Sequence, residues 1–357
     1  MSCQPNTRFF QSKPCLSCRS AGVAVLFFAW VVLFSSCFKE DRPIVLPEAP
    51  GSSVETVFLG SEYQNQLFYN LSRLDYVQRD IRDWDLAFDC RTDSFKVVTN
   101  YGRDIFVART QLHDLTSLTQ SFNHRDFDWL YDFPSGVLDS NAFGNWKAEH
   151  GSSTPYYLID MGRRLPQEER YYYVRVVEAN PDSYTLHIGL LFENGSSDPT
   201  VLTWPRNPSQ TYTYVNLRTQ QVMTDFEPPK NDWDILFTRY RHIFYIEPNP
   251  ELPFPYLVTG ALLNPYNTQV AIDSVTPFHD IDLDFCTRQT YSTSPDAIGY
   301  AWKDFDFSVT FTYSINSLKT YIVKNQHGQY YKIRFLDFYN ENRLRGYPKF
   351  EIKPVLY

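Results

Sequence analysis

The chain has 357 residues with a formal net charge of -8, and 43% of its residues are hydrophobic, 17% aromatic and 21% charged. This composition predicts a folded protein with room for two ordinary domains, and it excludes a disordered chain. An acidic chain without clustered Lys and Arg has no electrostatic footprint for nucleic acid, so we expect no nucleic-acid partner.

The first 36 residues have the layout of a secretory signal peptide. Fourteen consecutive uncharged, mostly apolar residues at Ala21–Phe34 follow the basic residues Arg8, Lys13 and Arg19. An uncleaved membrane anchor is the alternative, but this stretch falls short of the roughly 20 residues that a spanning helix needs. The letters "FSSC" come next and resemble a bacterial lipobox, which implies cleavage before Cys37 and acylation of that cysteine.

Residues 37–56 are predicted to form a lipidated terminus and a tether. The letters "KED" at 39–41 resemble the surface-export signal of Bacteroidota lipoproteins, and "RPIVLPEAPGSS" after them has the composition of a linker. We therefore expect a lipid-anchored protein of the outer membrane that faces the cell exterior. Removal of the signal peptide and lipidation of Cys37 leave Cys90 and Cys286, between which a bridge stays open.

Two nearly identical stretches, "DWDLAF" at 83–88 and "DWDILF" at 232–237, indicate an internal duplication. The flanking elements recur in the same order. An aromatic residue and Asn-Leu precede each stretch, while "AFGNWK" and "AIGYAWK", then "YYYVRVVE" and "YYKIRFLD", follow it. We interpret the two stretches as equivalent scaffold strands, with the Trp of each packed in the core of its own repeat.

The spacing between equivalent positions sets the length of the repeat. It grows from 146 residues at the Asn-Leu pair to 159 at the last strand pair, as small insertions would produce. We predict a first repeat at residues 57–205 and a second at 208–357. A period near 150 with two copies excludes a β-propeller, whose blades recur about every 40–45 residues.

The local pattern predicts an all-β fold of two tandem antiparallel domains. Five segments are rich in Tyr, Phe, Val and Ile and alternate or run apolar, at 171–179, 183–192, 307–315, 319–325 and 330–339. Turn-forming clusters such as "NPDS" and "NQHG" separate the strands, and helix signals are few.

Each repeat resembles the HmuY family, the haem-binding surface lipoproteins of Bacteroidota. The second repeat carries the resemblance through "YVNL", "DWDILFTRY", "AIGYAWKDF" and "TYIVKNQHGQYYKIRFLDFY", and the first keeps "YNL", "DWDLAF", "AFGNWK" and "YYYVRVVE". The resemblance implies HmuY-like β domains and, in the best-studied branch, a haem held between two axial ligands. One ligand lies in the long loop before the Trp segment, and the other follows that Trp by a few residues.

Histidines in these loops are the candidate haem ligands that the resemblance implies. In the first repeat His150 follows Trp146, and the preceding loop offers His113 and His124, so we take His124 with His150 as the pair. In the second repeat His279 lies in the corresponding loop, and no His, Met or Cys closely follows the Trp segment. A neutral imidazole nitrogen is a good iron ligand.

These features predict a surface lipoprotein that binds haem or a related small ligand for haem and iron acquisition. A TonB-dependent transporter is the expected recipient. The alternative is a non-enzymatic module that has lost haem ligation and binds a glycan or a protein, since exposed Tyr and Trp also stack on sugar rings. Without HExxH, GxSxG or a glycine-rich phosphate loop, we expect no enzymatic activity and no metal beyond haem iron.

Overall fold

The computed structural model describes residues 51–116, 122–135, 141–193, 195–245, 251–306, 308 and 310–356. The predicted signal peptide, Cys37 and most of the predicted tether lie outside these residues. The described residues belong to the compact unit Ala49–Tyr357. Within the described part of the chain, every helix is too short or too polar to cross a membrane.

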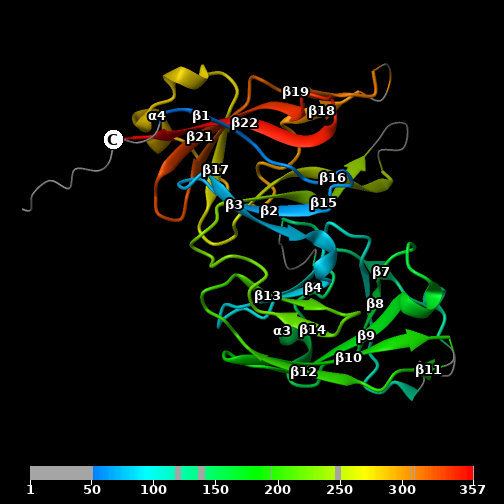
Figure 1. Ribbon diagram of the computed structural model, residues 1–357. Helices are drawn as coiled ribbons and strands as arrows, with labels where there is room; N and C mark the ends of the chain where they lie inside the picture. The colour runs from blue at the N-terminus through cyan, green and yellow to red at the C-terminus, as the bar shows by residue number, and fades with distance from the viewer. Residues whose placement is uncertain are drawn as a thin grey trace, which may run out of the picture. The chain divides into compact units, whose positions relative to one another are not determined.

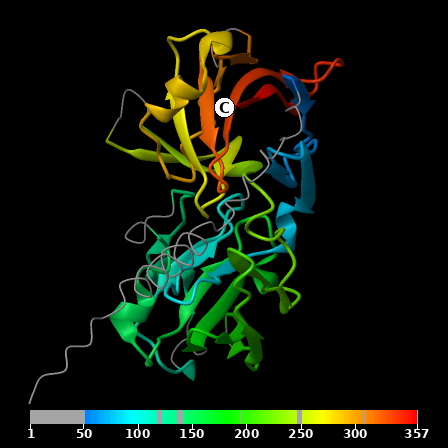
Figure 2. The same ribbon diagram turned by 90° about the vertical axis from the view of Figure 1, so that its left-hand side faces the viewer.

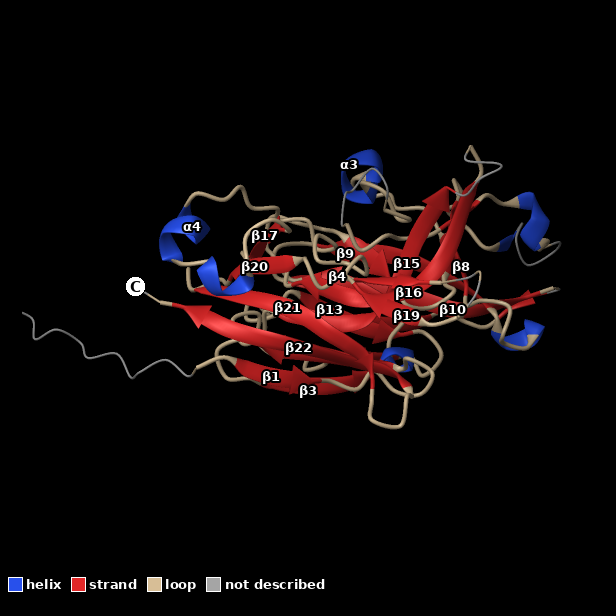
Figure 3. Ribbon diagram, turned by 90° about the horizontal axis from the view of Figure 1, so that it is seen from above, coloured by secondary structure: helices blue, strands red, loops and turns tan. Residues whose placement is uncertain are grey.

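Antiparallel strands dominate the described residues, and the helices between them are short (Figures 1 and 3). This confirms the predicted all-β fold, which the many aromatic and β-branched residues favour. The helical segments are α3 (Trp146–His150), α4 (Leu283–Thr287) and the 3-10 turns η1 (Ile81–Asp83), η2 (His124–Asp126), η4 (Gln167–Glu169) and η5 (Phe278–Asp280).

Two sheets are built only from consecutive strands of the middle of the chain, which we call the inserted unit. The larger sheet contains β11 (Gly195–Ser196), β10 (Ser183–Phe192), β9 (Tyr171–Ala179), β8 (Tyr157–Asp160), β6 (Phe106–Arg109) and β7 (Trp129–Leu130), with β12 (Thr200–Pro205) also on β10. The smaller sheet contains β14 (Gln221–Met223), β13 (Tyr212–Asn216), β4 (Leu86–Asp89) and β5 (Val97–Thr99).

The remaining sheets combine the start of the chain with its end, and we call them the outer unit. The first contains β1 (Ser53–Thr56), β22 (Arg345–Val355), β21 (Tyr330–Tyr339), β20 (Thr320–Lys324) and β17 (Gln269–Asp273). The second contains β16 (Pro253–Leu263), β15 (Ile235–Tyr245), β2 (Asn65–Asn70) and β3 (Asp75–Asp80), and a small one pairs β18 (Lys303–Phe305) with β19 (Tyr313–Ile315). Figure 2 shows the blue N-terminal strands beside the red C-terminal ones.

The first hairpin of each predicted repeat therefore pairs with the other repeat. Strand β2 of the first repeat pairs with β15 of the second, and β13 of the second repeat pairs with β4 of the first. The boundaries 57–205 and 208–357 stay a prediction about sequence repeats. In space, the strands group as β4–β14 on one side and β1–β3 with β15–β22 on the other.

Most of the strands expected from the sequence are present at the expected positions. The predicted segments 171–179, 183–192 and 330–339 coincide with β9, β10 and β21, and 319–325 contains β20. Of the predicted strand 307–315, the structure forms β19 at its end, and residues 307 and 309 lie outside the described residues.

The three largest hydrophobic clusters of the described residues hold the sheets together. One lies within the inserted unit around Phe88, Trp146 and Tyr172, and one lies within the outer unit around Tyr69 and Trp302. The third contains side chains of both units, and we call it the shared cluster. Both described cysteines, at positions 90 and 286, are buried free thiols, so no bridge joins them.

Candidate functional site

The second aspartate of each Asp-Trp-Asp stretch holds the hairpin that comes from the other repeat. Asp234 Oδ2 accepts a hydrogen bond from the Leu71 backbone N–H at 2.8 Å, and Asp85 Oδ2 accepts one from Leu217 at 2.7 Å. The Asn-Leu pair lies where the first strand of each hairpin ends and its turn begins, so the two repeated motifs of the sequence meet in space. The strands themselves begin only after these aspartates, at β4 and β15.

The tryptophans of these stretches pack in the shared cluster rather than in the core of their own repeat, which corrects the interpretation from the sequence. Trp84 lies edge-on to Tyr214 with ring centroids 5.0 Å apart, and Trp233 lies edge-on to Phe68 at 5.1 Å. The partner ring comes in each case from the exchanged hairpin. Trp84 Nε1 donates to Gln66 at 2.8 Å, whereas the buried Trp233 Nε1 has no partner among the described residues.

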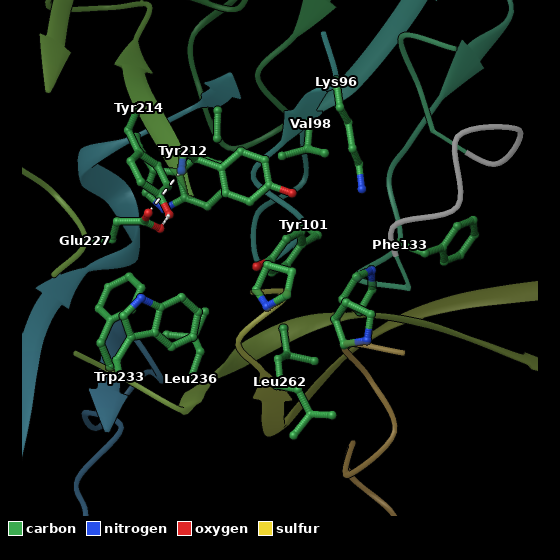
Figure 4. Close-up of a pocket in the computed structure, with 17 residues that line it drawn as sticks. Lys96, Val98, Tyr101, Phe133, Tyr212, Tyr214, Glu227, Trp233, Leu236 and Leu262 are labelled. Carbon is green, nitrogen blue, oxygen red and sulfur yellow. Dashed lines mark hydrogen bonds between the residues drawn. The ribbon is translucent and has the colours of Figure 1, made fainter. Parts of the chain in front are cut away.

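A pocket of about 70 Å³ opens beside the shared cluster (Figure 4). Seven of its seventeen lining residues are aromatic, and two charged side chains, Lys96 and Glu227, also line it. The aromatic lining residues are Phe68, Trp84, Tyr101, Phe133, Tyr212, Tyr214 and Trp233. Because the lining comes from both repeats, the pocket exists only when the two repeats are joined.

We call this 70 Å³ pocket the central pocket, and Glu227 is its buried acid. Its carboxylate accepts hydrogen bonds from the backbone N–H groups of Thr211 and Tyr212, the latter at 3.0 Å, and from Tyr214 Oη at 2.9 Å. These donors favour the charged form, but burial outweighs them and raises the pKa of Glu227 to about 7. The central pocket therefore holds a carboxyl group that takes up or releases a proton near neutral pH.

Lys96 lies between the central pocket and a second pocket of about 310 Å³. Burial lowers the pKa of Lys96, and Asp132 and Asp89 act in the opposite direction. The second pocket is lined by residues 93–96 and 144–148, which include the first turn of α3. Lys96 is the residue that the two linings share.

The histidines predicted as ligands lie in three different places. His124, in η2, stacks on Tyr171 with ring centroids 6.0 Å apart, and His150 ends α3 with its ring nitrogen 3.9 Å from Glu149. His279, in η5, is 82% exposed. Among the described residues no two of the three share a hydrogen-bond, ion-pair or ring partner, and no cluster of three or more His, Cys, Asp or Glu has the arrangement of a metal site.

Comparison with known proteins finds a family resemblance near the end of the chain. Residues 264–352 match the family model described as "HmuY protein". This segment of the chain is therefore similar to the HmuY family. No functionally curated protein is significantly similar to the chain.

Three solved structures resemble the chain at low identity. Apo PinO from Porphyromonas gingivitis is 9% identical, with 86% of this chain and 98% of that chain covered and a TM-score of 0.29. The apo HmuY analogue of Tannerella forsythia is 8% identical, with coverages of 87% and 100% and a TM-score of 0.25. A Bacteroides vulgatus protein described as HmuY-like and heme-binding is 16% identical, with coverages of 39% and 82% and a TM-score of 0.18. These TM-scores are too low to support a conclusion about this chain.

The HmuY match covers part of the core of the outer unit. It contains Trp302, which stacks on Phe335 with ring centroids 4.1 Å apart, and the strands β17 to β21 with most of β22. It also contains His279 and excludes His124 and His150. The similarity of the first repeat to HmuY stays a prediction, which the equivalent contacts of Asp85 and Asp234 support.

Pocket size limits which ligand these sites accept. Pockets for drug-sized ligands measure about 300–1,000 Å³, so the central pocket is too small for a porphyrin and the second pocket is at the lower limit. Neither lining contains a histidine, and His150 lies two residues beyond the lining residue Ala148. The sequence signals that pointed to histidines did not indicate Glu227 or Lys96. Glu227 lies in a bend after β14, and Lys96 directly precedes β5.

Proposed function

We propose that this chain is a lipid-anchored outer-membrane protein that binds haem, or a related ligand, at the cell surface for haem and iron acquisition. The observation that carries the proposal is the HmuY match over residues 264–352. Transfer of the haem to a TonB-dependent transporter completes the proposed role.

The histidines supply the ligand chemistry for this proposal. His150 ends the short helix α3, whose first turn lines the 310 Å³ pocket, and lies two residues after the lining residue Ala148. His279 is the exposed imidazole within the HmuY match. A neutral imidazole would bind the iron, and two such ligands would produce a low-spin haem.

Titration of haem into the purified full chain tests the proposal. We expect a sharp Soret band with the Q-band pattern of low-spin iron, and weaker binding in His124→Ala, His150→Ala or His279→Ala. His187→Ala is the control, because His187 lies within β10 and pairs with Arg175 and Val201 in the sheet. If no spectral change beyond non-specific adsorption appears, haem is not the ligand. If all three variants bind haem like the wild type, the histidine assignments are wrong.

The lipid anchor has a separate test. Cys37→Ala should remove acylation and release the protein from the outer membrane, because the lipid is the proposed attachment. Mass spectrometry of the mature terminus and protease accessibility on intact cells measure the two expected results. An unlipidated wild-type protein, or one protected from external protease, contradicts the proposed location.

An exposed aromatic face favours the second candidate function, a surface protein that binds a glycan or a protein. Phe254 and Tyr256 lie on one face of the β15–β16 hairpin towards its far end, and each is 50% exposed, with their rings stacked at 6.1 Å. Exposed aromatic rings stack on sugars. Binding of the wild type to a glycan array, reduced in Tyr256→Ser and unchanged in His279→Ala, would favour this function over haem binding.

A further inference from the structure

Strands β21 and β22 carry a basic face on the side opposite the core. Lys332 lies directly opposite Lys353, and Arg334 lies directly opposite Glu351, while Ile333 between them is buried in the core. Side chains alternate between the two faces of a sheet, so the four polar residues share one face. Figure 3 shows the two strands side by side, with β1 next to β22.

The Lys332–Lys353 pair is electrostatically unfavourable as it stands. Like charges directly opposite each other on neighbouring strands destabilise a sheet. Lys332 is also only 4% exposed, and its Nζ donates to the carbonyl oxygens of Phe278 at 2.6 Å and Ile281 at 2.7 Å. Burial lowers the pKa of Lys332, and Lys353 acts in the same direction. The fold thus holds one cation in place beside a second one, and the Lys332 nitrogen lies 5.0 Å from the centroid of the Phe278 ring.

The carboxylates nearby are already engaged with other basic groups. Glu351 Oε2 accepts from Arg334 Nε at 2.7 Å and lies 2.6 Å from Arg334 Nη2, and Asp280 lies 3.3 Å from the His279 ring nitrogen. Within the described residues, neither Lys332 nor Lys353 forms an ion pair with a carboxylate. The face therefore carries a local excess of positive charge on a chain whose net charge is -8.

A pocket of about 170 Å³ lies over this face. Its polar lining residues are Ser52, His279, Lys332, Arg334, Glu351 and Lys353. A water molecule needs only about 10–15 Å³ of such space, so a small hydrated anion fits. We propose that this pocket is an oxyanion site that binds a phosphate group between Lys332, Lys353 and the remaining N–H groups of Arg334. His279 lines this pocket and is also a proposed haem ligand, so phosphate binding is tested on the haem-free protein and through Lys353 and Arg334, which the haem proposal does not use.

Calorimetric titration of inorganic phosphate into the haem-free full chain tests the site. Lys353→Gln should raise the Kd about tenfold, the effect of losing one charged hydrogen bond. Lys349→Gln is the matched control, because Lys349 is an exposed lysine of the same strand that lies opposite Asp337 and outside the pocket. Arg334→Gln provides a second variant and should also raise the Kd while Lys349→Gln leaves it unchanged.

The phosphate could come from solution or from a lipid headgroup, and vesicles separate these sources. The protein is sedimented with phosphatidylcholine vesicles that either contain or lack phosphatidic acid. If the phosphate belongs to a lipid headgroup, more protein should bind the vesicles that contain phosphatidic acid. Lys353→Gln should abolish this extra binding, and Lys349→Gln should retain it. Phosphate binding without this difference identifies a soluble ligand. Equal phosphate affinity in the wild type and Lys353→Gln, or no binding of phosphate in either form, overturns the proposal.

Discussion

Glu227 makes stability depend on pH in a direction opposite to that of an ordinary paired carboxylate. Burial raises its pKa to about 7 in the folded protein, above the value near 4.5 of an unfolded glutamate. The folded state therefore holds the proton more tightly, so the contribution to stability is full below about pH 4.5 and is lost as the pH rises through about 7.

We predict that Glu227→Gln removes much of this pH dependence. The wild type should lose on the order of 3 kcal/mol of unfolding free energy from this group between pH 5 and pH 8, and the amide cannot titrate. Urea unfolding measures the unfolding free energy of wild type and variant at the two pH values. Comparison of the two proteins isolates the effect of Glu227, because other groups such as Asp234 contribute equally to both. A variant with the full wild-type pH dependence would show that another group is responsible.

The equivalent aspartates Asp85 and Asp234 should differ sharply on mutation. Asp85 forms an ion pair with Arg103, whereas Asp234 Oδ1 has no partner among the described residues and burial raises the pKa of Asp234 to about 6. Asp85→Asn should destabilise the protein by roughly 3 kcal/mol at pH 7, because a partly buried guanidinium loses its counter-charge. Asp234→Asn should change stability by less than about 1 kcal/mol, since it removes an unpaired buried charge. Equal losses in urea unfolding would contradict this asymmetry.

At the scale of elements, the turn after β5 joins the inserted unit to β15. The Tyr101 carbonyl oxygen accepts a hydrogen bond from the Arg241 backbone N–H at 2.8 Å, and the Gly102 carbonyl oxygen accepts one from Arg239 Nε at 2.7 Å. The two backbones approach so closely that a Cβ on Gly102 would lie 2.5 Å from the Arg239 carbonyl oxygen and would also strike the Ile81 side chain.

Gly102→Ala should therefore destabilise the protein by roughly 2 kcal/mol, the usual effect of overpacking. Gly51→Ala is the control, since a Cβ there meets nothing within 4 Å. The midpoint of urea unfolding measures both variants. A wild-type midpoint for Gly102→Ala would mean that the turn and β15 separate easily.

The elements were predictable where the information is local. Alternating apolar residues and turn clusters located β9, β10 and β21, because strand formation depends on the residues of the strand itself. The exchange of hairpins was not predictable, because Asn70-Leu71 and Asn216-Leu217 carry the same local signal and either could pair with either scaffold strand. The central pocket was missed for the same reason, since Glu227 becomes a buried acid only when distant segments enclose it.

At the scale of the whole molecule, the sequence repeats and the spatial units have different limits. Residues 57–205 contain β2 and β3 without their partner β15, and they lack β13, which supplies Val215 to the core of the inserted unit. Residues 81–227, by contrast, contain every strand of the two sheets of the inserted unit, together with Glu227 and its donors on Thr211, Tyr212 and Tyr214.

A fragment of residues 81–227 should therefore fold alone, whereas a fragment of residues 57–205 should not. The first keeps all its strand partners. It loses contacts of the shared cluster and the hydrogen bonds from β15 to Tyr101 and Gly102, so part of Trp84 becomes exposed and the stability of the fragment is lower than that of the full chain. The second leaves two exposed strand edges and an incomplete core. Near-ultraviolet circular dichroism and cooperative urea unfolding distinguish the outcomes. Cooperative unfolding of 57–205 together with a disordered 81–227 would show that the repeats, and not the exchanged strands, define the folding units.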